Sequence, residues 1–182
     1  MKQPAVIVDV NGTLGDCTNR MSFIEDPNNR DWDGFFRHMM VDKPVDFVHR
    51  FCNAQPHHPF FCQVILITGA PERYRSLMLQ WLEENQIHFD HLYMRGDKQF
   101  IRGVDFKKKL LNDHLLDQFD IVCVLEDKEE CAIMYRELDI LCWLVAPCPY
   151  PRGDAVTTMQ TSQRATTRGR RQRSTGRAPR PR

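Results

Sequence analysis

The chain has 182 residues, of which 42% are hydrophobic, 10% aromatic and 27% charged, enough to build one globular domain with a short appendage. No apolar run approaches the roughly 20 residues needed to span a bilayer, and the N-terminus lacks a signal-peptide pattern because Asp9 interrupts its apolar stretch. Seven scattered cysteines without a CxxC pair disfavour a disulfide framework or a zinc site, so we expect a soluble intracellular protein.

The net charge of +1 conceals two oppositely charged parts of the chain. Residues 152–182 contain nine arginines and one acid, Asp154, whereas residues 1–151 carry 16 basic and 23 acidic side chains. No aromatic residue follows Tyr150, and a segment built from Arg, Thr, Ser, Gly and Pro cannot bury enough apolar surface to offset the entropy of ordering it. We therefore predict a folded domain over residues 1–148 and a disordered, Arg-rich tail over residues 149–182.

Short apolar runs rich in β-branched residues alternate with helical periodicities along the predicted domain. The runs predict strands at 5–10, 63–67, 121–125 and 140–145, with a weaker signal at 91–94. Helices are predicted around 33–52, where Pro44 should break the helix, and then around 71–82, 106–115 and 131–138. This alternation predicts right-handed βαβ units and a Rossmann-like parallel sheet flanked by helices.

Polar residues directly follow the apolar part of three of the predicted strands. They are Asp9 and Asn11, Thr68 and Gly69, and Glu126 and Asp127. Ligands of open parallel sheets bind at the carboxyl ends of the strands, which makes these pairs the candidate site. Two simpler interpretations stay open at this point: Thr68–Gly69 as an ordinary strand-ending turn, and Glu126–Asp127 as the N-terminal charges of a helix.

Four segments taken in chain order resemble the motifs of haloacid-dehalogenase (HAD) superfamily phosphohydrolases. They are "DVNGTL", "ILITG", "VDFKKKLL" with Lys107, and "VLEDK". Together with "DWDGFF" and "LYMRGDKQ", they make residues 5–146 similar to the phosphatase domain of phage-type polynucleotide kinase–phosphatases and related phage phosphatases. No GxxxxGK[ST] P-loop occurs, so we expect no kinase half.

The resemblance implies a HAD-type fold with a minimal cap and Mg²⁺-dependent phosphatase chemistry. It makes Asp9 the nucleophile that forms an aspartyl-phosphate. It assigns Mg²⁺ to oxygen ligands, the donors this ion prefers: the carboxylates of Asp9, Glu126 and Asp127 and the backbone carbonyl of Asn11. The implied catalytic set is Asp9, Asn11, Thr68 and Lys107.

The resemblance also implies contacts to the phosphoryl group. Thr68 and the backbone amides around Gly12 and Gly69 would hydrogen-bond its oxygens, and Lys107 would offset the charge of phosphate and nucleophile. Arg20 corresponds to an arginine that contacts substrate phosphate, a task suited to a guanidinium. An arginine usual in the subfamily is missing at Ala70, and we expect Arg73 to substitute for it.

Asn11 departs from the family pattern at a chemically sensitive position. The family has an acid there, which protonates the leaving oxygen and then activates water, and losing such a group typically costs about 10²–10⁴ in rate. Three explanations stand: a slow or altered phosphotransferase, a degenerate phosphatase retained for binding, or deliberate replacement of an aspartate to trap a complex. "EDK" in place of the more usual DDR is a milder change, because Glu126 can still bind metal.

We therefore expect a Mg²⁺-dependent phosphomonoesterase, a polynucleotide 3′-phosphatase-like enzyme weakened by Asn11, whose substrates are 3′-phosphate ends of nucleotides or nucleic acid. The alternative is a catalytically silent HAD-like protein that binds nucleic acid or a partner. The basic tail would attract nucleic acid through phosphate contacts, an attraction that depends on salt. A phage-encoded protein of this kind would act in the host cytoplasm.

Overall fold

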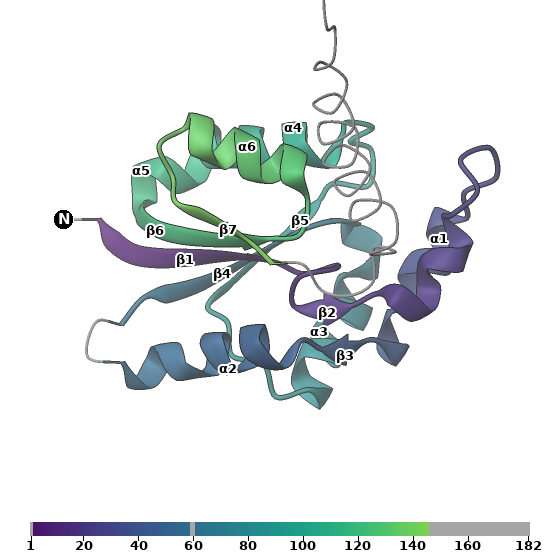
Figure 1. Ribbon diagram of the computed structural model, residues 1–182, viewed down its shortest axis with the longest axis horizontal. Helices are drawn as coiled ribbons and strands as arrows, with labels where there is room; N and C mark the ends of the chain where they lie inside the picture. Colours follow the sequence, from purple (N-terminus) through teal and green to yellow (C-terminus); the bar gives the residue numbers. More distant parts are fainter. Residues whose placement is uncertain (1, 59–60, 146–182) are drawn as a thin grey trace, which may run out of the picture. The chain divides into compact units, whose positions relative to one another are not determined.

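The computed structural model describes residues 2–58 and 61–145, so the predicted tail over 149–182 lies outside the described residues and the boundary at 148 stays a prediction. The described residues contain a five-stranded sheet in the order β5-β4-β1-β6-β7, with every neighbouring pair parallel (Figure 1). Its strands are β1 (Gln3–Asp9), β4 (Gln63–Pro71), β5 (His91–Arg95), β6 (Phe119–Glu126) and β7 (Cys142–Leu144). The predicted α/β class and all five predicted strands are confirmed.

Helices cover both faces of this sheet (Figure 1). On one face lie α2 (Asp46–Ala54) and α3 (Arg75–Glu84), and on the other lie α4 (Gly103–Leu110), the π-helical turn η5 (Leu111–Leu115), α5 (Leu116–Gln118) and α6 (Glu129–Glu137). Because side chains alternate along a strand, Val6 and Val8 of β1 pack in the first core cluster and Ala5 and Ile7 in the second. Burial on both faces explains why the strand sequences are continuous apolar runs.

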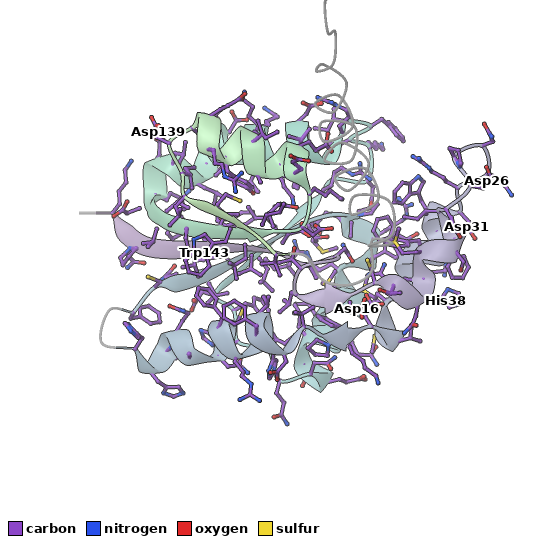
Figure 2. All side chains as sticks on the ribbon, in the orientation of Figure 1. Asp16, Asp26, Asp31, His38, Asp139 and Trp143 are labelled. Carbon is purple, nitrogen blue, oxygen red and sulfur yellow. The ribbon has the colours of Figure 1, made fainter. Side chains whose placement is uncertain are left out.

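The connection from β1 to β4 carries a small additional unit, which occupies the place of the minimal cap. It contains β2 (Gly15–Asp16), η1 (Thr18–Phe23), α1 (Trp32–Arg37), η2 (Met39–Val41) and β3 (Lys43–Pro44), with β2 antiparallel to β3. Asp31, labelled in Figure 2, caps α1 by accepting a hydrogen bond from the Gly34 N–H at 2.7 Å. Pro44 lies in β3, so the helical pattern over 33–52 is divided into α1 and α2 as the proline predicts.

The strand order places a topological switch point at β1. From β1 the chain crosses to β4 on one side, and β6 lies on the other, so the carboxyl ends of these three strands are neighbours. In the registers, Asp9 is opposite Ile67 and Val8 is opposite Leu125. The polar residues that follow these strands therefore converge on one edge of the sheet.

The structure corrects the bounds of the predicted strands: four of them shift by one or two residues at an end, and β4 differs most. The described residues also contain four 3₁₀ segments that periodicity does not predict. β4 does not end at Ile67 but continues to Pro71, because its pairing with β5 shifts register after Thr68 and resumes at Pro71 opposite Arg95. The 3₁₀ segments are η1, η2, η3 (Gln55–His57) and η4 (Glu72–Tyr74). Within the described residues, no helix is both long and apolar enough to cross a membrane.

Candidate active site

The loop after β1 turns tightly around Gly12. The Leu14 N–H donates to the carbonyl oxygens of Asp9 (3.2 Å) and Val10 (3.1 Å), which closes the turn directly behind the strand. Gly12 has φ +98°, a left-handed value that glycine adopts without the steric cost other residues meet. A Cβ at this position would overlap the carboxylate of Asp127. Glycine therefore lets the loop pass close to the end of β6.

Three carboxylates and one lysine meet where β1 and β6 end. Asp9 is the last residue of β1, Glu126 is the last of β6, and Asp127 follows it; one oxygen from each lies within 4.8 Å of the others. The Lys107 ammonium, on α4, donates to Asp9 Oδ1 and to Glu126 Oε2, both at 2.5 Å. Asp9, Glu126 and Lys107 are almost completely buried. The structure thus brings together the predicted nucleophile, the predicted lysine and the predicted acids.

Burial dominates the electrostatics of this cluster. It raises the pKa of Asp9 to about 6, against the opposing attraction of the Lys107 ammonium, and it also raises the pKa of Glu126 and of Asp127. Burial alone would lower the pKa of Lys107, but Asp9 and Glu126 outweigh it and hold this pKa well above its ordinary value. The lysine therefore stays charged and compensates two buried acids.

The carboxylates offer oxygens that the protein leaves unpaired. Asp9 Oδ2 and Asp127 Oδ1 are buried and have no hydrogen-bond partner among the described residues. A buried carboxylate oxygen without a partner is costly, and hard divalent cations take such oxygens as ligands. The donor set of Asp9, Glu126 and Asp127 therefore fits a divalent cation.

Asn11 lies between Arg20 and Thr68. Arg20 Nη2 donates to Asn11 Oδ1 at 2.6 Å, and Asn11 Nδ2 donates to Thr68 Oγ1 at 2.7 Å. The Arg20 guanidinium is buried: Nε and Nη2 donate to the Asp42 carboxylate at 2.6–2.9 Å, and Nη1 donates to the Phe35 carbonyl at 2.9 Å. Every guanidinium nitrogen of Arg20 already donates to the protein, so this residue contacts the candidate site through Asn11.

The other predicted phosphate contacts lie at the end of β4. A Cβ at Gly69 would meet no atom within 4 Å, so the backbone there faces open space. Arg73 is half-exposed; its guanidinium lies 3.7 Å from the Asp97 carboxylate and 4.8 Å from the centre of the Tyr74 ring. The contacts of Gly69 and Arg73 with substrate remain predictions.

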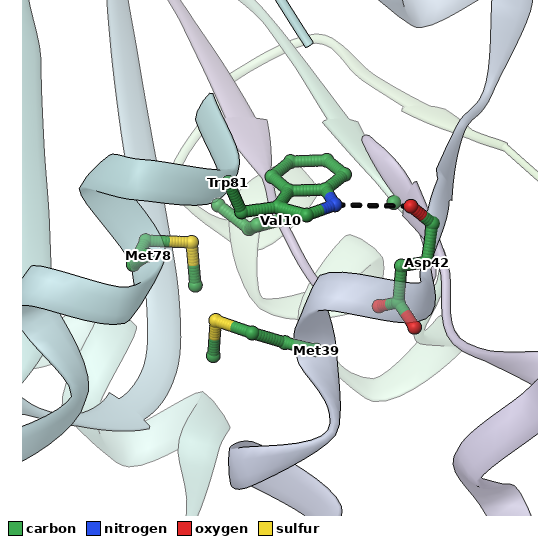
Figure 3. Close-up of a pocket in the computed structure, with 6 residues that line it drawn as sticks. Val10, Met39, Asp42, Met78 and Trp81 are labelled. Atoms are coloured by element: carbon green, nitrogen blue, oxygen red, sulfur yellow. Dashed lines mark hydrogen bonds between the residues drawn. The ribbon is translucent and has the colours of Figure 1, made fainter. Parts of the chain in front are cut away.

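Sequence reasoning missed Asp42, which holds Arg20 in place. Figure 3 shows this residue in a small pocket, where its carbonyl accepts a hydrogen bond from the Trp81 indole N–H at 3.0 Å. The pocket is lined by Val10, Gly15, Met39, Asp42, Met78 and Trp81. No sequence signal pairs Asp42 with Arg20, because the two residues lie 22 positions apart in segments without a shared periodicity.

Lys128 is a second residue to which the sequence assigned no role. Its backbone N–H donates to Glu126 Oε1 at 3.2 Å, and its charge lowers the pKa of Asp9 against the larger effect of burial. The motif "EDK", with lysine where the family usually has arginine, could have identified it. A second cation therefore acts on the predicted nucleophile.

The parallel sheet with helices on both faces is a HAD-type α/β fold, and the carboxylates and the lysine predicted for the site gather at its switch point. The likeness to solved structures agrees: two structures of Pnkp1/Rnl/Hen1 complexes, one described as an RNA repair complex, contain chains similar to this one. Their identities are 25% and 24%, their TM-scores 0.66 and 0.68, and the matches cover 79% and 82% of this chain but 42% and 48% of theirs. The class C acid phosphatase from Bacillus anthracis with tungstate bound shares the fold, with 13% identity, a TM-score of 0.54, and coverage of 97% of this chain and 82% of that one.

Within the HAD-type phosphatases, the chain can be assigned to one family. The family model of the polynucleotide kinase PNKP phosphatase domain matches residues 3–150, and the chain belongs to this family. It spans less than half the length of the chains it matches in the Pnkp1 complexes. No curated protein matches the chain. Family and fold together support phosphatase activity.

Proposed function

We propose that the chain is a Mg²⁺-dependent phosphomonoesterase that transfers the phosphoryl group of 3′-phosphate ends to Asp9. The observation that carries this proposal is the buried carboxylate cluster, in which Lys107 holds one oxygen of Asp9 while the other has no partner among the described residues. Asp9, Glu126 and Asp127, with the backbone carbonyl of Asn11, would hold the ion. When bound, Mg²⁺ would supply positive charge that stabilises the transferring phosphoryl oxygens.

The residues of the chain then have distinct tasks in the first half of the reaction. A carboxylate oxygen of Asp9 attacks phosphorus, a phosphorus–oxygen bond forms, and the bond to the leaving oxygen breaks. Lys107 and the Thr68 hydroxyl, with the amides near Gly12 and Gly69, oppose the charge on the phosphoryl oxygens. These contacts need no proton transfer and do not depend on an acid at position 11.

Asn11 affects the proton transfers on either side of this step. An amide neither protonates the leaving oxygen nor removes a proton from the water that hydrolyses the phospho-aspartate, so water must supply and accept these protons without a positioned side chain. Esters with good leaving groups, which need little protonation, should therefore react fastest. Phosphorylated Asp9 should accumulate, because its hydrolysis lacks a base.

The substrate class rests on the family and on charge. The family consists of phosphatase domains of a polynucleotide kinase, and the similar Pnkp1 chains belong to complexes that include an RNA repair complex. The nine arginines of residues 152–182 supply a net positive charge that the acidic remainder of the chain lacks, and such charge attracts nucleic-acid phosphates. Both observations favour a nucleic-acid 3′-end over a small metabolite.

The test is phosphate release from p-nitrophenyl phosphate and from matched oligonucleotides that carry a 3′-phosphate or a 5′-phosphate. The proposal predicts release that requires Mg²⁺, is blocked by EDTA, is lost in Asp9→Ala and favours the 3′-phosphate. Release that survives Asp9→Ala would refute the nucleophile. Equal rates on 3′- and 5′-phosphates would refute the substrate class and leave the phosphatase standing.

A second candidate is a catalytically silent domain that binds nucleic acid or a partner, and Asn11 is the observation that favours it. The two functions differ in what an acid at position 11 restores. A silent domain predicts no Asp9-dependent turnover in the unmodified protein, whereas the proposed phosphatase predicts slow turnover that increases in Asn11→Asp.

A further inference from the structure

A chain of hydrogen bonds, buried between Asp42 and Arg20 and part-buried at Asn11, runs from Asp42 through Arg20 and Asn11 to Thr68. Both oxygens of Asp42 accept from Arg20, whose Nη2 also donates to Asn11 Oδ1 at 2.6 Å. Asn11 Nδ2 then donates to Thr68 Oγ1 at 2.7 Å. The chain ends at the hydroxyl of Thr68, which follows Ile67, the residue opposite Asp9 in the register of β1 and β4.

Arg20 fixes the orientation of the Asn11 amide. A guanidinium has donors only, so the atom of Asn11 that faces it must be the oxygen, and the NH₂ group must face Thr68. The guanidinium cannot easily turn, because it is buried, bonded to Asp42 and Phe35, and lies 4.0 Å from the centre of the Phe35 ring. The direction of the hydrogen bond, from the Asn11 NH₂ group to Thr68, is therefore determined by the donor-only guanidinium of Arg20.

Thr68 consequently accepts on both of its lone pairs. The second donor is the backbone N–H of Ala70, at 3.1 Å from Thr68 Oγ1. A hydroxyl has two acceptor sites and one proton, so the proton of Thr68 is left for a further acceptor. Among the described residues, Thr68 has no such acceptor.

We infer that Asn11 is a positioning residue that, held by Arg20 and Asp42, makes Thr68 a dedicated hydrogen-bond donor to the phosphoryl group. This inference rests on the proposed function, because it takes the phosphoryl group as the missing acceptor. An aspartate at position 11 would act in the opposite sense, since a carboxylate accepts from both Arg20 and Thr68 and would draw the hydroxyl proton toward itself. Asn11 therefore cannot transfer protons as an aspartate would, but it strengthens the binding of phosphate through Thr68.

The test is a double-mutant cycle between positions 11 and 68 in the full chain. Calorimetry measures the affinity of each variant for inorganic phosphate in the presence of Mg²⁺. Thr68→Val keeps the shape and removes the hydroxyl, and it should weaken phosphate binding by about 10- to 100-fold, the usual cost of a hydrogen bond to a charged group. Asn11→Ala should weaken binding in the unmodified protein and have no further effect in the Thr68→Val background. Asn11→Leu, which is closer in size, replaces Asn11→Ala if the alanine variant does not fold.

Two further variants separate positioning from general damage. Thr68→Ser retains the hydroxyl and should keep both phosphate affinity and sensitivity to Asn11→Ala. Asn28→Ala, the same substitution at an exposed residue, should change neither. Equal weakening by Asn11→Ala with and without the Thr68 hydroxyl would overturn the inference, as would unchanged affinity in Asn11→Ala.

The outcomes also distinguish this inference from the proposed function. If the unmodified protein binds phosphate and turns over p-nitrophenyl phosphate while the cycle is additive, the positioning role fails and the phosphatase stands. If it neither binds phosphate nor turns over the ester, the proposed function fails, and the inference fails with it.

Discussion

Gly12 meets two constraints at once, a left-handed backbone and close approach to the Asp127 carboxylate. Gly12→Ala should lower the free energy of unfolding by about 1–3 kcal/mol, because a strained backbone position costs this much, and it should displace the predicted metal ligand. Urea unfolding and Mg²⁺-dependent turnover measure the two effects. The matched control is Gly69→Ala, where a Cβ meets no atom within 4 Å; equal destabilisation by both substitutions would contradict this account.

Lys107 compensates two buried acids, Asp9 and Glu126, which its removal would leave without a cation in contact. Lys107→Met should cost about 3–5 kcal/mol of unfolding free energy at neutral pH in EDTA, the range for one half of a buried ion pair. The control is Lys109→Met, on the same helix, whose partner Asp113 is exposed and whose loss should leave stability nearly unchanged.

The cost of Lys107→Met should depend on pH in a defined direction. The pKa of Asp9 is raised from 3.8 to about 6 even with the lysine present, so the ionised carboxylate is disfavoured in the folded state, and stability is lost as the pH rises through this interval. Removing the lysine raises that pKa further. The difference in unfolding free energy between the variant and the unmodified protein should therefore shrink as the pH falls from 7.5 toward 4; a difference independent of pH would contradict it.

At the scale of residues, the sequence predicted which side chains form the candidate site better than it predicted the contacts they make. Asp9, Glu126 and Lys107 could be found because each belongs to a motif tied to a strand end or a following helix, and the structure joins them. Arg20 could also be found, but not its burial against Asp42. That pairing depends on how the β1–β4 connection folds back, which no local periodicity encodes.

At the scale of elements, α3 contacts the β1–β4 connection through Trp81. Its indole N–H donates to the Asp42 carbonyl (Figure 3), and a Cβ at Gly15 would lie 3.2 Å from the indole ring, a tight contact. Trp81→Phe should lower the unfolding free energy by about 1–3 kcal/mol, because a buried carbonyl loses its donor. Leu79→Ala, at a more exposed position of α3, is the control and should have a smaller effect.

β4 shows why boundaries are harder to predict than elements. Its apolar run ends at Ile67, yet the strand continues through Thr68 to Pro71, because the pairing with β5 resumes after a register shift. Only the pairing partner determines that extension. Within the same extension, the Ala70 N–H donates a hydrogen bond to Thr68 Oγ1, a contact that the sequence could not predict.

At the scale of the whole molecule, charge is divided between an acidic part of the chain and nine arginines in residues 152–182. Replacing the eight arginines of residues 164–182 with glutamine should weaken binding of a single-stranded oligonucleotide and make it less dependent on salt, because fewer counterions are released. Turnover of p-nitrophenyl phosphate should not change. An unaltered salt dependence of oligonucleotide binding would show that these arginines do not contact nucleic acid.

The central claim is that Asp9 accepts the phosphoryl group and that the phospho-aspartate is hydrolysed slowly because Asn11 cannot act as a base. The most direct measurement mixes the protein with p-nitrophenyl phosphate and Mg²⁺, follows nitrophenolate from the first turnover, and determines the intact mass after an acid quench. The account predicts a burst of about one nitrophenolate per site and one phosphoryl group on Asp9; Asn11→Asp should abolish the burst and raise steady turnover by up to about 10²–10⁴. Turnover without a burst or added mass, unchanged in Asn11→Asp, would contradict it.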